Sequence, residues 1–143
     1  MTDLLAQILN VRDFHWIRVK RGSIDLVELA SQLQPHGITV VPIEADETID
    51  SWRPLFDLLD RKLTLGGSAH YNWNALNDVI GDRDYWMDES LFGENGYVIV
   101  FSGLETLSRT DPESYQFLQE VLVGSAPGEI NAQGRFSKAL ELV

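Results

Sequence analysis

Short, nearly continuous apolar runs rich in β-branched residues occupy residues 38–43 (ITVVPI) and 97–102 (YVIVFS). Runs of this length and composition predict buried strands. Pro42 cannot donate a ladder hydrogen bond, so it should lie at the end of its strand or on an unpaired edge. The tail 134–143 (GRFSKALELV) is interpreted as a final strand.

Apolar residues recur at helical spacing after the first of these strands. Residues 51–63 should form an amphipathic helix, with Asp50 or Ser51 as its N-cap and Pro54 tolerated in the first turn. Its predicted apolar stripe consists of Trp52, Leu55, Phe56, Leu59 and Leu63.

Two further helices are predicted. One begins between residues 70 and 72, after the glycine pair 66–67, which should stop the preceding helix. The other begins at Asp111 or Ser114, carries an apolar stripe, and ends at Gly124.

Strands that alternate with helices predict an α/β fold, a small parallel sheet of about three strands covered by helices. The order β-α-α-β-α-β fills residues 38–143, which we interpret as one domain. Before it, residues 14–22 (FHWIRVKRG) resemble a strand and residues 23–34 (SIDLVELASQLQ) a helix. Residues 1–37 would thus be an N-terminal βα extension, and the pattern does not decide whether it extends the same sheet.

Charge adds a functional constraint. The formal net charge is −11, and the excess lies in residues 38–143, which hold 18 acids and 7 bases, whereas residues 1–37 hold four of each. Such a surface repels nucleic acid phosphates and attracts cationic partners. We therefore expect no direct nucleic acid binding. Acidity that serves solubility alone is the simpler alternative.

Composition narrows the chemistry further. Cysteine is absent, which excludes disulfides and thiolate catalysis and fits a reducing, cytoplasmic compartment. No apolar stretch reaches the roughly 18 residues of a membrane span, and no secretory leader is recognisable. The histidines at 15, 36 and 70 suggest no catalytic set, and the acids at 82, 84 and 88 lack the spacing of a calcium loop. We expect no enzyme, no metal and no cofactor.

Residues 69–82 (AHYNWNALNDVIGD) carry a resemblance to a known family. Asn72, Trp73, Ala75, Leu76 and Asp78 match, in order and without a gap, the signature Asn-(Trp/Leu)-Asp-Ala-Leu-x-Asp on the second helix of the barstar family. Residues 38–143 therefore resemble inhibitors of barnase-type ribonucleases. The resemblance implies a ribonuclease inhibitor or immunity (antitoxin) protein that blocks the cleft of a basic nuclease or toxin domain with an acidic helix. We expect a monomer or weak oligomer.

Helical spacing alone separates the two sides of this segment. The predicted buried stripe consists of Trp73, Leu76 and Ile80. The predicted solvent-exposed face holds Asn74, Asn77, Asp78 and Gly81. The resemblance implies that Asp78 enters the ribonuclease's phosphate site, where a carboxylate can mimic a substrate phosphate. The simpler alternatives are a solvated carboxylate at Asp78 and an Asn72 that only caps the helix.

Two positions depart from the family pattern. Asn74 stands where a second carboxylate is usual, and His70 replaces the usual loop glycine. A neutral amide mimics phosphate poorly, and His70 would add positive charge below about pH 6.5. The partner should therefore differ from barnase itself.

The segment after this helix, residues 82–94, interleaves five acids with aromatic residues. Such residues are typical of interface anchors, although they can also cover the edge of a core. The full set of predicted partner contacts is Asp78, Asn74, Asn77, His70, Tyr71, Asp82, Tyr85 and Trp86.

Two alternatives stay open at this point. One is a barstar-fold adaptor or regulator of a different basic protein, which Asn74 and the neutral N-terminal extension favour. The other is an enzyme acting on a small cationic substrate, for which the sequence offers no constellation.

Overall fold

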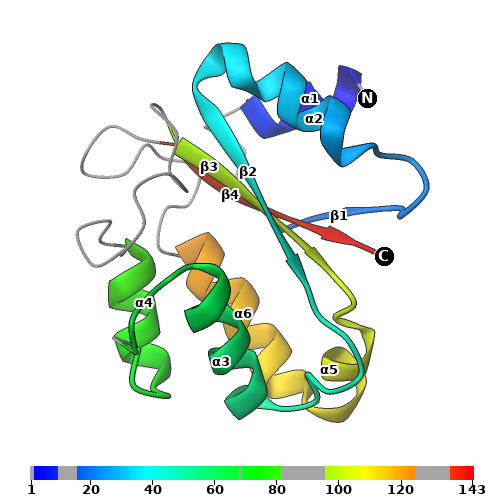
Figure 1. The fold of residues 1–143 in the computed structure, drawn as a ribbon. Helices are drawn as coiled ribbons and strands as arrows, with labels where there is room; N and C mark the ends of the chain where they lie inside the picture. Colours follow the sequence, from blue (N-terminus) through cyan, green and yellow to red (C-terminus); the bar gives the residue numbers. More distant parts are fainter. Residues whose placement is uncertain (1, 10–15, 68, 82–95, 125–135) are drawn as a thin grey trace.

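The computed structural model describes residues 2–9, 16–67, 69–81, 96–124 and 136–143. Its centre is one parallel sheet in the order β1-β4-β3-β2 (Figure 1). The strands are β1 (Ile17–Val19), β2 (Ile38–Glu44), β3 (Gly96–Ser102) and β4 (Phe136–Leu142). The predicted α/β fold with a parallel sheet is confirmed.

The N-terminal strand belongs to this sheet. Ile17 pairs with Leu140 and Val19 with Leu142, so β1 lies at the edge beside β4. The sheet therefore has four strands, one more than residues 38–143 supply. The division of the chain at residue 37 remains a prediction.

Helices cover both faces of the sheet (Figure 1). We call one side the four-helix face, which is covered by α3 (Trp52–Lys62), α4 (Trp73–Gly81), α5 (Glu105–Thr110) and α6 (Pro112–Gly124). The other side is the N-terminal face, which is covered by α1 (Thr2–Leu9) and α2 (Leu26–Leu33). A short 3-10 helix, η1 (Gln34–His36), joins α2 to β2.

The apolar character of β3 follows from this layering. Tyr97, Ile99 and Phe101 belong to the core of the four-helix face, while Val98 and Val100 belong to the core of the N-terminal face. A strand buried on both faces needs apolar residues at every position, in contrast to the alternation of a half-exposed strand.

Pro42 lies on the unpaired edge of the sheet, as its missing donor predicts. Ala45 donates its N–H to the carbonyl of Ser102 at 2.8 Å, and backbone groups alternate along a strand. The position of Pro42 therefore faces away from β3, where no ladder hydrogen bond is lost.

Helix α3 confirms most of its predicted stripe. Leu55, Phe56, Leu59 and Leu63 are buried. Trp52 lies on the same side of the helix, since its ring meets that of Phe56 at 6.2 Å between centroids. At the first turn 37% of Trp52 remains exposed.

A buried carboxylate ties β1 to the rest of the fold. Glu141 on β4 is only 3% exposed. It accepts hydrogen bonds from the Trp16 indole N–H at 2.9 Å and from the Tyr115 hydroxyl, and Arg18 lies 3.6 Å away. Burial of the Tyr115 hydroxyl and its hydrogen bond to Glu141 raise the pKa of Tyr115 above its usual 10.0. Two of the three partners come from the strand segment at the N-terminus, so this segment is part of the core.

Helices long and apolar enough to cross a bilayer are absent from the part of the chain that the structure describes.

Candidate partner-binding site

Helix α4 begins at a side-chain cap. The Asn72 side chain accepts the Ala75 N–H at 3.1 Å, and its carbonyl accepts the Leu76 N–H at 2.9 Å. This is the capping geometry that the sequence predicts for Asn72. The cap fixes where the helix starts and therefore which residues share each of its faces.

The inner side of α4 is held by aromatic packing. Leu76 is buried, and the half-buried Trp73 meets Phe56 of α3 edge-on at 4.8 Å and Phe117 of α6 at 5.5 Å between ring centroids. These contacts confirm the predicted inward positions of Trp73 and Leu76. The side chain of Ile80, the third predicted member of the stripe, lies outside the described residues.

The outer side of α4 is polar. Asn74, Asn77 and Asp78 are all exposed there, as the helical spacing predicts. Within the described residues no cation forms an ion pair with Asp78, so its charge faces solvent. Helices α1 and α2 lie across the sheet from α4 and do not cover this surface (Figure 1).

The loop before α4 holds His70 and Tyr71 in the left-handed backbone region, each with φ of 51°. This region disfavours residues with a Cβ, and it is common for glycine. A glycine at position 70 would adopt this conformation without that cost. Backbone strain of this kind persists only where surrounding contacts impose it.

Those contacts surround the ring of Tyr71. The ring stacks on Phe56 at 6.1 Å, its hydroxyl donates to Asp57, and the Arg53 guanidinium lies 4.8 Å from its centroid. The hydrogen bond to Asp57 raises the pKa of Tyr71. Nevertheless 46% of Tyr71 remains exposed, so it presents a rigid aromatic surface beside the start of α4.

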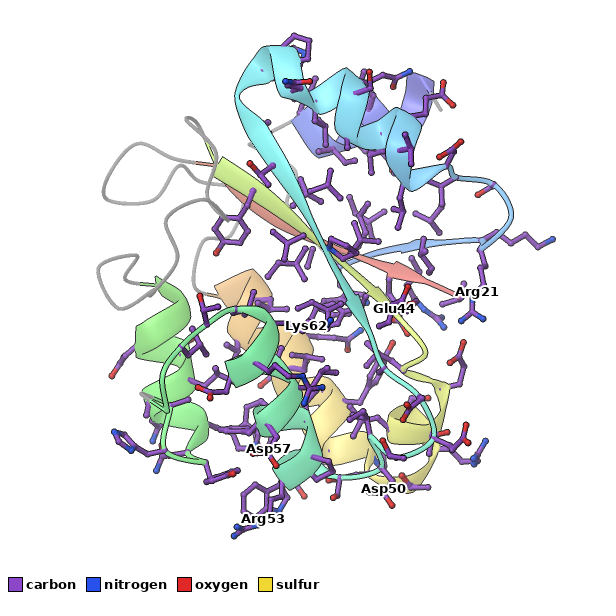
Figure 2. All side chains as sticks on the ribbon, in the orientation of Figure 1. Arg21, Glu44, Asp50, Arg53, Asp57 and Lys62 are labelled. Atoms are coloured by element: carbon purple, nitrogen blue, oxygen red, sulfur yellow. The ribbon has the colours of Figure 1, made fainter. Side chains whose placement is uncertain are left out.

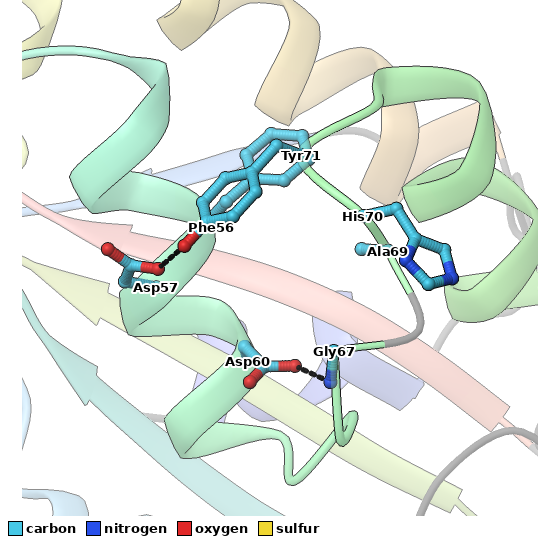
Figure 3. A pocket seen from close by; sticks show the side chains of 7 residues that line it. All are labelled: Phe56, Asp57, Asp60, Gly67, Ala69, His70 and Tyr71. Carbon is cyan, nitrogen blue, oxygen red and sulfur yellow. Dashed lines mark hydrogen bonds between the residues drawn. The ribbon is translucent and has the colours of Figure 1, made fainter.

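A small pocket of about 60 Å³ opens next to Tyr71 (Figure 3). Asp57 and Asp60 of α3 lie on one side of it and His70 lies on the other. Asp60 accepts the Gly67 N–H at 2.6 Å, which holds the loop against α3. The pocket has room for one small polar group.

Sequence reasoning missed the contribution of α3 to this region. Asp57 and Asp60 are three residues apart on the polar side of a predicted helix that ends at a glycine pair, which was a usable signal. Nothing in the pattern signalled that Arg53 lies over the rings of Trp52 and Tyr71.

The predicted contacts fall into two groups. The structure brings His70, Tyr71, Asn74, Asn77 and Asp78 together on α4 and the loop before it. Asp82, Tyr85 and Trp86 lie outside the described residues. Within the described part of the chain, no group of three or more acidic or histidine side chains is arranged to hold a metal ion.

Comparison with known proteins agrees with the fold and with the placement of this helix. The family model for barstar (barnase inhibitor) matches residues 40–135, which begin within β2 and include α3, α4, β3, α5 and α6. A search of curated proteins finds no significant match. Because the family model covers more than half of the chain, the chain belongs to the barstar (barnase inhibitor) family.

Proposed function

We propose that this chain inhibits a basic ribonuclease by inserting the outer face of α4 into its active-site cleft. Asp78 would accept charge-assisted hydrogen bonds from the cations that otherwise bind a substrate phosphate. Asn74 and Asn77 would set the register of the helix, and Tyr71 would pack at the edge of the cleft. The inhibitor would act by occlusion and in a one-to-one complex.

One observation carries this proposal. Asp78 lies exposed on a helix whose opposite side is fixed by Trp73 and Leu76, so the carboxylate is presented at a defined place. Among the residues that the structure describes, no cation forms an ion pair with it. The net charge of −11 supports the same reading, because it speeds encounter with a cationic protein.

The test is a comparison of Asp78→Asn with Glu113→Gln. Both changes remove one exposed carboxylate, but Glu113 lies in the first turn of α6. Inhibition of RNA cleavage is measured against a panel of basic barnase-type ribonucleases. Loss of a charge that is desolvated against cations costs about 2–5 kcal/mol, so Asp78→Asn should raise the inhibition constant by about 30-fold or more. Glu113→Gln should change it by less than about threefold.

Two results would contradict this assignment. Equal losses in both variants would mean that only the overall charge matters. An unchanged inhibition constant in Asp78→Asn would remove Asp78 from the interface.

A second candidate is an adaptor or regulator that binds a different basic protein. Asn74, exposed on the same face as Asp78, is the observation that favours it, since an amide contributes no charge to a phosphate mimic. Complete lack of inhibition across the panel, by a chain that is folded, would favour this candidate. Restoration of inhibition by Asn74→Asp would instead support the ribonuclease inhibitor.

A further inference from the structure

A cleft of about 310 Å³ lies on the N-terminal face, at the carboxyl ends of the strands. Helices α1 and α2 pack on this face (Figure 1). Leu26, the first residue of α2, also lines the cleft. Pro42, Val100 and Leu142 give the cleft an apolar floor.

The cleft lies at the end of the sheet where α/β proteins commonly bind ligands. Open α/β sheets place ligands outside the carboxyl ends of their strands, and residues at or after these ends line the cleft. One of them, Arg21, follows β1, which precedes the part of the chain that matches the family model.

The rim of the cleft is held in place by backbone contacts. Val143 donates its N–H to Val19 at 2.8 Å, and Arg21 donates its N–H to Val143 at 2.9 Å, which fixes Arg21 at one side. Gly103 lies at the other side with φ of 77°, and a Cβ there would fall 2.0 Å from the carbonyl oxygen of Ala45. A glycine is therefore required at this position, because the turn after β3 packs closely against the turn after β2.

The charges around the rim are unequal. Arg21 forms an ion pair with Glu105 at 2.8 Å, so its positive charge is already compensated. Glu44, at the end of β2, is exposed and forms no ion pair within the described residues. Both Arg21 and Glu44 lie at the carboxyl ends of the strands (Figure 2). The Arg21–Glu105 pair is neutral, so the net charge around the cleft is that of the Glu44 carboxylate.

We propose that this cleft binds a small amphipathic cation, a primary amine or guanidine with a short apolar body. The body would cover Pro42, Val100 and Leu142, and the cationic head would pair with Glu44. The volume is at the lower end of the range for small-molecule sites, which limits the ligand to a short chain. The net charge of −11 favours cations over anions at this surface. The site is separate from α4, which lies on the other face of the sheet.

The experiment compares three ligands of equal chain length, hexylammonium, hexanol and hexanoate, in the full chain. Backbone amide shifts are followed by NMR. Hexylammonium should shift amides of residues that line the cleft, hexanol should shift the same amides at higher concentration, and hexanoate should leave them unchanged.

Two variants should move the affinity for hexylammonium in opposite directions. Glu44→Gln should weaken binding by up to about fivefold, the upper range for an exposed ion pair. Arg21→Gln should strengthen it, because Glu105 then loses its cation. Glu113→Gln, on α6, and Asp78→Asn, on α4, should leave it unchanged. These two controls keep the test independent of the proposed inhibition.

Three results would overturn the proposal. The first is hexanoate binding as tightly as hexylammonium. The second is an unchanged affinity in Glu44→Gln. The third is a set of shifts spread over both faces, which would indicate adventitious cation binding to an acidic surface.

Discussion

The two faces of the sheet are built from different kinds of side chain. The described core of the N-terminal face consists only of Ile, Leu and Val, for example Ile8, Leu29 and Val98. The four-helix face contains aromatic rings as well, among them Phe56 and Phe101. Aliphatic side chains exclude water without strong directional preferences, whereas aromatic pairs favour particular orientations. A core with aromatic rings can therefore hold a covering helix in a defined orientation, whereas an aliphatic core mainly excludes water.

The aromatic residues of the four-helix face form a connected series. Ring contacts run from Trp52 to Tyr71 at 6.1 Å, and onward through Phe56 and Trp73 to Phe117. The series joins α3, the loop before α4, α4 itself and α6. It fixes the orientation of α4, whose outer face is the proposed inhibitory surface. The N-terminal face has no comparable series among its described core residues. Its role is to cover the sheet and exclude water from it.

Removal of residues 1–37 should have the largest effect among the changes that test this difference between the two faces. Without them Val98 and Leu140, both fully buried, would face solvent, and Glu141 would lose Trp16 and Arg18. Loss of a single buried Leu or Ile side chain costs about 2–5 kcal/mol, and a whole domain is stable by only about 5–15 kcal/mol. We expect residues 38–143 alone to show no cooperative thermal unfolding by circular dichroism.

A point variant tests the same face at smaller scale. Leu29→Ala, at a fully buried position of α2, should lower the free energy of unfolding by about 2–5 kcal/mol. Val27→Ala on the same helix, where the side chain is 79% exposed, should change it by less than about 0.5 kcal/mol. A cooperative, native-like transition in residues 38–143 alone would show that the N-terminal face is dispensable.

The Glu141 cluster should have the next largest effect, because it links β1 to the four-helix face. Glu141→Ala would leave the Trp16 indole and the Tyr115 hydroxyl without their acceptor, which should cost about 2–3 kcal/mol in urea unfolding. Tyr115→Phe removes one hydrogen bond and should cost about 1 kcal/mol. Arg18→Gln should cost less still, since the Arg18 side chain is 62% exposed. A loss of the same size in Arg18→Gln and Glu141→Ala would contradict this order.

The raised pKa of Tyr115 adds a dependence on pH. The folded state holds the phenol proton more tightly than the unfolded chain, so this contribution is complete below the ordinary value of 10.0 and is lost as pH rises above it. The free energy of unfolding should therefore fall more steeply above pH 10 in the parent chain than in Tyr115→Phe. Phenolate absorbance during an alkaline titration checks the assignment. Tyr71, whose pKa is also raised by its hydrogen bond to Asp57, should contribute to any slope that persists in the variant.

The elements that the sequence predicts best are those with a strong local signal. Strands β2 and β3 contain nearly continuous apolar runs, and the Asn72 cap is local in sequence, so these features are recognisable without the fold. The six-residue helix α5 (ETLSRT) carries no apolar period and was not predicted. The helix α1, also unpredicted, gains its stability by packing against the N-terminal face.

Features that depend on distant pairing could not be predicted. Glu141 is buried because β1 pairs with β4 and brings Trp16 and Arg18 to it across more than 120 positions of sequence. The exposure of Trp52 has a similar cause, since helical spacing identifies a stripe but not where the core beneath it ends. In the candidate site, the face of α4 was predictable and the pocket beside Tyr71 was not, because the left-handed backbone at a tyrosine has no sequence signal.

The smallest expected changes in stability come from substitutions at two residues with left-handed backbone, one in a loop on each face of the sheet. The N-terminal face enters β2 through Gly37, which has φ of 71°, whereas the loop on the four-helix face uses His70, with φ of 51°. A left-handed conformation costs a residue with a Cβ roughly 1 kcal/mol relative to glycine. Gly37→Ala should therefore lower the free energy of unfolding by about 1 kcal/mol. His70→Gly should raise it by about 0.5–1 kcal/mol.

The two substitutions should change the free energy of unfolding in opposite directions, and equilibrium urea unfolding measures both changes. If His70→Gly destabilises the chain, the imidazole makes contacts that outweigh the backbone strain. If it stabilises the chain while inhibition of the ribonuclease weakens, the strain at His70 is kept for recognition, as is common where strained residues occur at binding surfaces. Unchanged inhibition would assign His70 to the loop alone and leave Asp78 as the centre of the surface.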